Sequence, residues 1–375
     1  MANTGFYKGT KRKKRNYVFI PALILLAFIS VFVVAFFSLQ KYAVITKDDV
    51  EVISPFDEAK EYDDEGNEVV DFDEVDVNII FDDPDYSSVE QADVGDVSEM
   101  RAIFVPYDDL TWEKLEEYAS RLSSGNSLVL EMKPRGGQLA WYSNATEAIN
   151  YGLSVETTTT QYIASYVQSL KDRGIYLVAQ ISCCVDGRFS TYSTSVALRN
   201  SLGNNYIDDT GTWLDPYNLH VRNYTVEMVK ELWAMGFDEV VLADVAHPTI
   251  AEDSSTIIMY TRSLSSTQSP MNAVCGFAVQ VAEELEEEKA GKLSIYVYSA
   301  TALAKVDTQN GQDAELFFKL YDRVYYITDK YAFQFNVTDI ENDVTVGKVA
   351  DRFVPVVYNY LPENTSWVLI DYDED

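Results

Sequence analysis

Residues 213–248, WLDPYNLHVRNYTVEMVKELWAMGFDEVVLADVAHP, contain a complete helix-to-strand unit. A loop leads into the amphipathic stretch 219–235, a glycine turn follows, and the apolar run 239–243 has the length of a buried strand. In parallel α/β proteins, ligands bind at the carboxyl ends of such strands. This unit therefore places Asp244 and His247 at a candidate binding site.

The alternation of apolar runs and helical segments continues through residues 100–375. Continuous rather than alternating apolarity indicates strands buried on both faces, and intervening helices indicate parallel βαβ units. Eight such strands predict an α/β fold, a (β/α)8 TIM-like barrel, with an open doubly wound sheet as the alternative. The expected strands are 101–105, 127–132, 175–182, 239–243, 293–298, 323–328, 353–358 and 367–371, and the expected helices are 112–122, 159–173, 219–235 (capped by Asn218), 272–290, 313–321 and 340–351.

The amino terminus predicts a membrane anchor. Residues 17–39 contain no charge, and about 20 apolar residues are enough to span a bilayer as a helix. A cleaved signal peptide is the alternative, but its apolar core is shorter and ends at a small-residue cleavage site. The preceding basic cluster predicts a cytoplasmic amino terminus and an extracellular remainder. That cluster is Lys8, Lys11, Arg12, Lys13, Lys14 and Arg15.

The next segment is strongly acidic. Residues 47–99 carry 21 acidic side chains against two lysines, so they repel one another and cannot bury a core. An extended stalk is the preferred interpretation; a docked strand at 75–81 and a calcium loop are alternatives, although DDEGNE lacks the EF-hand spacing. The predicted organisation is a cytoplasmic segment 1–16, a transmembrane signal anchor 17–39, an acidic stalk 40–98 and a barrel domain 99–375.

The amino-acid composition limits the kinds of partner that the protein is expected to bind. The net charge of −31 argues against nucleic acid, because phosphate binding needs lysine and arginine. Three cysteines, with Cys183 and Cys184 adjacent, form neither a disulfide framework nor a zinc-ligand spacing. A strained bridge between that pair is less expected than two buried thiols. We find no pattern for a metal, a cofactor or a serine-histidine-aspartate triad.

Four segments resemble the putative glycosyl hydrolase domain family, whose members are related to the α-amylase-like barrels of bacterial cell-surface proteins. They are SLVLEMKPRGGQLAWYS, RGIYLVAQISCCVDGRFS, WLDPYNLHVRNYTVEMVKELWAMGFDEV and FVPVVYNY, and together they span most of residues 100–360. The resemblance implies a glycoside hydrolase barrel. It places Glu131 and Lys133 on the second-strand motif and Asp186 on the third-strand motif, where Gln180 replaces the usual arginine.

The fourth strand departs from the family pattern. An ungapped match puts Ala243 at the family's aspartate and Ala246 at its arginine, with Asp244 displaced by one residue. One residue along a strand reverses the side-chain direction. Asp244 therefore replaces the family's aspartate only if a local β-bulge redirects it.

Glycoside hydrolysis usually needs two carboxyl groups, one as acid and the other as nucleophile or base. The candidate catalytic residues at strand ends are Asp244, Glu131 and Asp186, with Asp371 a weaker candidate beside the acidic tail. Each has a structural alternative as a buried partner, a turn or a cap. The candidate substrate-binding residues are Lys133, Asp215, His247, Trp141 and Trp213. Carbohydrate rings stack on aromatic faces such as those of the two tryptophans.

These observations lead to two alternatives for the function. The first is a membrane-anchored extracellular protein, resembling glycoside hydrolases, that acts on polysaccharide or cell-wall glycan through strand-end carboxylates. The second is a catalytically degenerate barrel that binds glycan or a protein at the cell envelope. Ala243 and Ala246 favour the second, and whether the protein is an enzyme stays open.

Overall fold

The computed structural model describes residues 43–45, 50–52, 89, 97–122, 127–250, 257–261, 269–304, 306–328, 349–358 and 366–370. The chain divides into two compact units, residues 1–79 and 80–375. In the first unit, β1 (Ala43–Ile45) and β2 (Val50–Val52) pair as antiparallel strands, a pairing that the sequence did not predict. Within the described ranges no helix is both long and apolar enough to cross a membrane; the predicted span 17–39 and strand 75–81 lie outside these ranges.

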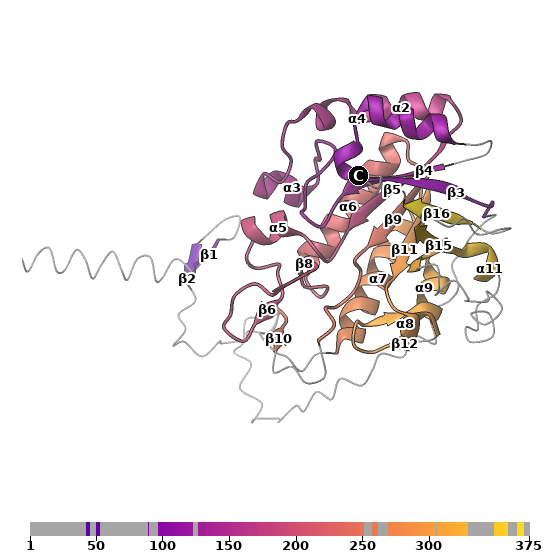
Figure 1. Ribbon diagram of the computed structural model, residues 1–375. Helices are drawn as coiled ribbons and strands as arrows, with labels where there is room; N and C mark the ends of the chain where they lie inside the picture. Colours follow the sequence, from indigo (N-terminus) through magenta and orange to yellow (C-terminus); the bar gives the residue numbers. More distant parts are fainter. Residues whose placement is uncertain are drawn as a thin grey trace, which may run out of the picture. The chain divides into compact units, whose positions relative to one another are not determined.

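The second unit contains a closed barrel of eight parallel strands with helices outside it (Figure 1). The last strand hydrogen-bonds to the first, which excludes the open sheet. Every strand boundary lies within one residue of its prediction, because each apolar run is bounded by polar or turn residues. The strands are β3 (Arg101–Val105), β4 (Ser127–Lys133), β5 (Tyr176–Ser182), β9 (Glu239–Ala243), β11 (Lys292–Val297), β14 (Val324–Thr328), β15 (Phe353–Tyr358) and β16 (Trp367–Ile370).

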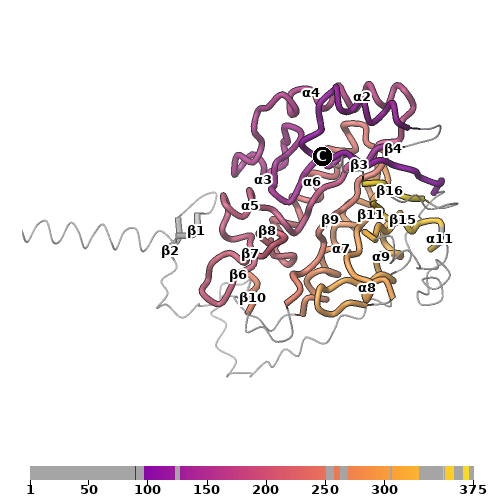
Figure 2. Tube along the Cα trace, in the orientation of Figure 1, coloured from indigo at the N-terminus to yellow at the C-terminus, as the bar shows by residue number. Residues whose placement is uncertain are grey.

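Five of the six predicted helices form between the strands, and their ends follow capping chemistry; residues 340–348 of the sixth, 340–351, lie outside the described residues. Asn218 accepts a hydrogen bond from the His220 amide at the start of the predicted helix, and Gly236 ends it with a φ of 113°. In both ribbon and tube views α2 and α4 run side by side (Figures 1 and 2). The helices are α2 (Trp112–Arg121), α3 (Thr146–Tyr151), α4 (Thr158–Asp172), α5 (Gly187–Tyr192), α6 (Leu219–Met235), α7 (Pro270–Glu286), α8 (Ala300–Ala304), α9 (Ala314–Leu320) and α11 (Val349–Arg352), with a 3-10 turn η1 (Tyr107–Asp109).

Side chains alternate across the barrel wall. On β5, Leu177, Ala179 and Ile181 pack against the helix layer, whereas Val178 belongs to a separate apolar cluster inside the barrel. Ala243 lies in the same inner cluster. The inner cluster fills the barrel, so the open space that a ligand needs lies at its carboxyl end.

The opposite end of the barrel is closed by a buried polar network around Glu239. Its carboxylate accepts hydrogen bonds from Ser294, Tyr325 and Tyr176 at 2.7, 2.7 and 2.9 Å, and forms an ion pair with Arg323. These residues join β5, β9, β11 and the start of β14. A buried carboxylate is tolerated when it is paired and fully hydrogen-bonded, so this end of the barrel is structural.

Short hairpins and loops extend beyond the strand ends. The pairs are β6 (Arg199–Asn200) with β10 (Ile258–Met259), β7 (Ile207–Asp208) with β8 (Gly211–Thr212), and β12 (Val306–Asp307) with β13 (Gln312–Asp313). The cysteines Cys183, Cys184 and Cys275 are buried and free, as the sequence favoured. Burial raises the pKa of the Cys183 thiol to about 12, so this thiol is protonated and unreactive at neutral pH.

Candidate functional site

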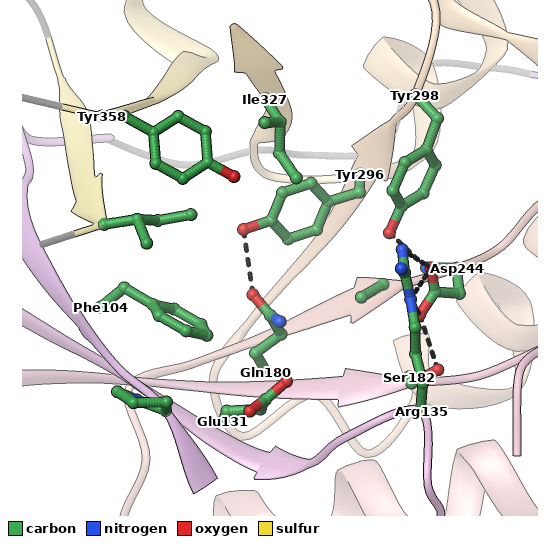
Figure 3. A pocket seen from close by; sticks show the side chains of 13 residues that line it. Phe104, Glu131, Arg135, Gln180, Ser182, Asp244, Tyr296, Tyr298, Ile327 and Tyr358 are labelled. Carbon is green, nitrogen blue, oxygen red and sulfur yellow. Dashed lines mark hydrogen bonds and ion pairs between the residues drawn. The ribbon is translucent and has the colours of Figure 1, made fainter. Parts of the chain in front are cut away.

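A pocket with a volume of about 290 Å³ opens at the carboxyl ends of the strands (Figure 3). Each of the eight barrel strands contributes to its wall, so the fold itself builds the pocket. It is lined by Phe104, Pro106, Glu131, Arg135, Gln180, Ser182, Ala243, Asp244, Tyr296, Tyr298, Ile327, Tyr358 and Ile370. Two of the predicted catalytic carboxylates, Glu131 and Asp244, are among them.

Glu131 lies on β4 in a largely desolvated position. Its carboxylate accepts one hydrogen bond, at 3.0 Å, from the Tyr107 amide of the turn η1. Burial raises the pKa of Glu131, and the Asp244 carboxylate raises it further, against the opposing effects of the Tyr107 amide and Arg135. Glu131 thus has the character of a group that holds a proton, as a general acid does.

Asp244 follows the last residue of β9 and has a left-handed backbone, with a φ of 56°. This conformation is rare for residues other than glycine, and it redirects the side chain that strict alternation would send into the helix layer. The carboxylate accepts hydrogen bonds from Arg135 and, at 2.7 Å, from the Ser182 hydroxyl. The predicted β-bulge is not what redirects Asp244: β9 pairs with β5 and β11 without a register shift, and the left-handed conformation of Asp244 after the strand end has that effect instead.

Arg135 and Tyr298 hold Asp244 in this position. Both oxygens of the carboxylate lie within 3.1 Å of the Arg135 Nε, and the Arg135 Nη2 lies 2.8 Å from one of them. The Tyr298 hydroxyl accepts a hydrogen bond of 2.6 Å from the Asp244 amide. Burial disfavours the charged form of Arg135, yet its hydrogen bond to Asp244 and the charge of that carboxylate raise its pKa, so Arg135 is a charged hydrogen-bond donor to Asp244.

The predicted residues Lys133 and Asp186 lie together, but not on the wall of this pocket. A shift of register in β4 between Glu131 and Lys133 breaks the strand alternation there. The Lys133 ammonium instead forms a buried ion pair of 2.8 Å with Asp186. Asp186 also caps α5 by accepting a hydrogen bond from the Phe189 amide. This geometry favours a structural role for both residues over the catalytic and substrate-binding roles that the sequence suggested.

The ion pair also supports the loop that carries Arg135. Gly137 has a φ of 81°, and a Cβ at this position would lie 1.9 Å from an oxygen of Asp186. Only glycine permits so close an approach. The Arg135 carbonyl accepts a hydrogen bond from the Gly187 amide, which fixes the loop against the start of α5. Lys133 and Asp186 therefore help to position Arg135 beside Asp244.

Asp215 and Trp141 have structural partners. Asp215 is buried and accepts hydrogen bonds from the Tyr217 amide and from both the amide and the hydroxyl of Thr261. The Trp141 indole donates to Glu231 of α6 at 2.7 Å. Neither residue lines the pocket. Their predicted role in substrate binding has no support from this placement.

His247 and Trp213 line a second pocket with a volume of about 260 Å³. This pocket shares Arg135, Asp244 and Tyr298 with the first. Among the described residues no group of three or more histidine, cysteine or acidic side chains suits a metal ion. The predicted Asp371 lies outside the described residues.

Several residues of the site were not singled out in the sequence. Arg135 stands in the segment KPRGG, where two glycines after a strand end indicate a tight turn that brings a side chain back over the barrel. Tyr296 and Tyr298 alternate along the end of β11, a spacing that puts both on the inner face. The Tyr296 hydroxyl donates to Gln180 at 3.0 Å. These two local signals were available in the sequence.

A closed (β/α)8 barrel with two carboxylates and an arginine in its mouth has the architecture of a glycoside-hydrolase-like domain. The chain belongs to the putative glycosyl hydrolase domain family, whose model matches residues 103–332. This membership confirms the resemblance seen in the sequence. No curated protein has significant similarity to this sequence.

Among solved structures, one with a TM-score of 0.50 has the same fold, and two others are similar at lower scores. The glycoside hydrolase domain of PgaB (BpsB) from Bordetella bronchiseptica is 12% identical, with a TM-score of 0.50, covering 74% of this chain and 95% of that one. A hypothetical protein from Ruminiclostridium thermocellum is 21% identical, with a TM-score of 0.44, covering 52% and 96%. The maltogenic α-amylase AmyB from Thermotoga neapolitana is 10% identical, with a TM-score of 0.44, covering 73% and 67%.

Proposed function

We propose that this protein hydrolyses glycosidic bonds, with Glu131 as the general acid and Asp244 as the nucleophile or as the base that activates water. The observation that carries the proposal is the contrast between the two carboxyl groups of one pocket. Glu131 is desolvated and its pKa is raised, whereas Asp244 forms an ion pair with Arg135. Paired carboxyl groups whose environments separate their protonation states are what acid-base hydrolysis requires.

In this mechanism the protonated Glu131 gives its proton to the glycosidic oxygen as the carbon–oxygen bond breaks. Asp244 either attacks the anomeric carbon directly or takes a proton from the water that attacks it. If Asp244 attacks directly, water then breaks the glycosyl–Asp244 bond while Glu131, now ionised, takes the proton of that water. On either path water supplies the hydroxyl group of the new reducing end, so atoms balance without any further reactant. Arg135 and Ser182 hold the Asp244 carboxylate in position while charge develops on the sugar.

One observation favours the alternative of a barrel that binds glycan without cleaving it. Both oxygens of Asp244 are engaged, by Arg135 and by Ser182. A carboxylate with this many donors is a weaker nucleophile than a free one. In that case the pocket would hold a sugar and release it unchanged.

The test is product release from a panel of bacterial cell-wall and plant polysaccharides, measured as new reducing ends. We expect release by the wild-type chain and a loss of about 100-fold or more in Glu131→Gln and Asp244→Asn, because each removes one partner of the reaction. Asp172→Asn, an exposed residue of α4, is the control and retains activity. Sugar binding without release by the wild type would establish the alternative.

We further propose that residues 17–39 anchor the protein in the membrane and that the barrel acts outside the cell on polysaccharide. The uncharged run, the preceding basic cluster and the acidic segment 47–99 support this arrangement. An acidic, self-repelling segment would stay extended and hold the barrel away from the membrane. Protease added to intact cells should then degrade the barrel and leave cytoplasmic proteins whole.

A further inference from the structure

Three aromatic side chains form a row in the helix layer outside the barrel, on α2 and α4. The ring centroids of Trp112 and Tyr166 lie 5.4 Å apart, and those of Tyr166 and Tyr162 lie 6.3 Å apart. The two helices run side by side (Figures 1 and 2), and none of the three rings lines the pocket in the mouth. This aromatic row is therefore separate from the proposed catalytic site.

The two ends of the aromatic row are open to solvent. Trp112 is 37% exposed and Tyr162 is 45% exposed, whereas Tyr166 between them is partly buried against the main hydrophobic core. The planes of neighbouring rings are inclined by only 38° and 20°, so a ligand that lies along the row meets rings of similar orientation. Single exposed apolar residues are normal, but a contiguous exposed group is typical of a binding surface.

Local contacts hold the aromatic row in a fixed geometry. The Thr111 side chain caps α2 immediately before the row begins, and a capping box formed by Thr157 and Thr160 starts α4. An ion pair of 2.9 Å between Glu116 and Arg173 links the two helices. A surface that is already ordered loses little conformational entropy when it binds a ligand.

The charges around the aromatic row indicate an uncharged ligand. Residues 157–170, which include most of α4, contain no charged side chain, although the net charge of the chain is −31. Thr158 and Ser169 continue the face of α4 that carries the two tyrosines, and they supply hydroxyl groups. On α2 the exposed Glu113 follows Trp112 and repels an anionic ligand. This combination matches a neutral polysaccharide, whose rings stack on aromatic faces and whose hydroxyls bond to hydroxyls.

The small extent of the aromatic row argues against a protein partner. Since a fully buried aromatic side chain covers about 150–250 Å², Trp112 and Tyr162 at their exposures offer together about 120–200 Å². One partner in a stable protein complex buries about 800 Å². A narrow row of rings suits a single polymer chain, which can follow the row one sugar after another.

We propose that the aromatic row is a binding site for a neutral polysaccharide on the outside of the barrel. The sugar rings stack on Trp112 and Tyr162, and the hydroxyls of α4 bond to the hydroxyls of the polymer. The row lies in the first turns of α2 and α4, and these helix ends are at the same end of a (β/α)8 barrel as the mouth. Binding at the row does not depend on hydrolysis in the mouth.

The test is electrophoresis of the full-length chain through native gels that contain a polysaccharide, in a detergent without a sugar headgroup. The neutral probes are hydroxyethyl cellulose, glucomannan and soluble starch, and polygalacturonate is the anionic probe. All chains carry Glu131→Gln, so that the polymer in the gel is not cleaved. We expect at least one neutral polysaccharide to retard the chain and polygalacturonate to leave it unretarded.

Trp112→Ala and Tyr162→Ala should each weaken this binding about tenfold, because each removes one stacking face. Tyr162→Phe keeps the ring and should bind within about threefold of the parent chain. The matched control is Tyr192→Ala on α5: Tyr192 is 60% exposed, and no aromatic ring of the described residues lies against it. Melting temperatures should be unchanged in all four variants, because the replaced rings are exposed.

Unchanged retardation in both Trp112→Ala and Tyr162→Ala, an equal loss in Tyr192→Ala, or no retardation of the parent chain by any neutral polysaccharide would each overturn the proposal. A dimer in sedimentation that dissociates in Trp112→Ala would overturn it as well and assign the row to a second copy of the chain. The outcome for hydrolysis is separate. Retardation that is lost in the row variants, without product release by the wild-type chain, would refute hydrolysis and retain the binding site.

Discussion

Tyr298 supports the left-handed backbone of Asp244 through a single hydrogen bond. Its hydroxyl accepts from the Asp244 amide at 2.6 Å, and the Asp244 φ of 56° is uncommon for a residue with a side chain. Tyr298→Phe leaves this amide unpaired, so we expect a loss of about 1–3 kcal/mol in the free energy of unfolding, measured in urea. Turnover should fall as well, because Asp244 can relax away from the mouth. Unchanged stability and turnover would show that Asp244 needs no such support; Tyr192→Phe, an exposed tyrosine, is the control.

We expect the Glu131 side chain to lower the stability of the folded protein at neutral pH. Its pKa is raised in the folded protein, chiefly by burial, so the folded state binds this proton more tightly than the unfolded state does. The stability from the bound proton is complete below the ordinary carboxyl pKa of about 4.3 and is lost as pH rises through the raised value. Glu131→Gln should therefore raise the melting temperature at pH 7 and have little effect near pH 3. Calorimetry at both pH values checks this, and a lower melting temperature at pH 7 would contradict it.

At the residue scale, the sequence predicted both carboxylates of the mouth but not their surroundings. Strand-end position is visible in a sequence, which is why Glu131 and Asp244 were candidates. The direction of Asp244 depends on one backbone angle, which no periodicity reports. The partnership of Arg135 with Asp244 joins residues 109 positions apart, so a local pattern cannot reveal it.

The buried pair of Lys133 and Asp186 joins the end of β4 to the start of α5. Lys133→Met leaves the Asp186 charge buried without its partner, so we expect a destabilisation of about 3–5 kcal/mol in urea. Lys114→Met, at an exposed pair on α2, should cost less than about 1 kcal/mol. If the two variants lose similar stability, the pair does not hold this junction together.

At the element scale, the strands were predictable because buried parallel strands are continuous apolar runs. The register shift in β4 could not be predicted, because SLVLEMK has no glycine or proline to mark it. That shift separates Glu131, which lines the pocket, from Lys133, which does not. α7 begins at Pro270 rather than the predicted 272 because Ser269 caps it and proline is favoured in the first turn.

The closed barrel could be predicted from the number of strands in the sequence. Eight strands with intervening helices close a barrel when the last pairs with the first, and β16 pairs with β3. The Glu239 network at the opposite end involves residues from four strands, and only the closed fold brings them together. The predicted strand 239–243 begins with Glu239, but a local pattern in the sequence cannot identify its partners.

The arrangement in the membrane is a prediction at the scale of the whole molecule. We expect the full chain to stay in the membrane fraction through a high-salt wash and to be released only by detergent, because an apolar span is held by burial and not by charge. Replacing Leu26 and Phe32 with arginine should disrupt this retention. Release of the wild-type chain by salt alone would contradict a transmembrane anchor.

The proposed roles of Glu131 as general acid and of Asp244 as nucleophile or base are tested most directly by varying the leaving group. In a dinitrophenyl glycoside the dinitrophenolate leaves without help from an acid, whereas a sugar leaving group needs a proton. We expect Glu131→Gln to lose about 100-fold or more in turnover of the ordinary substrate and far less with the activated one, and Asp244→Asn to lose activity on both. Equal losses for Glu131→Gln on the two substrates, or full activity of Asp244→Asn on either, would contradict it.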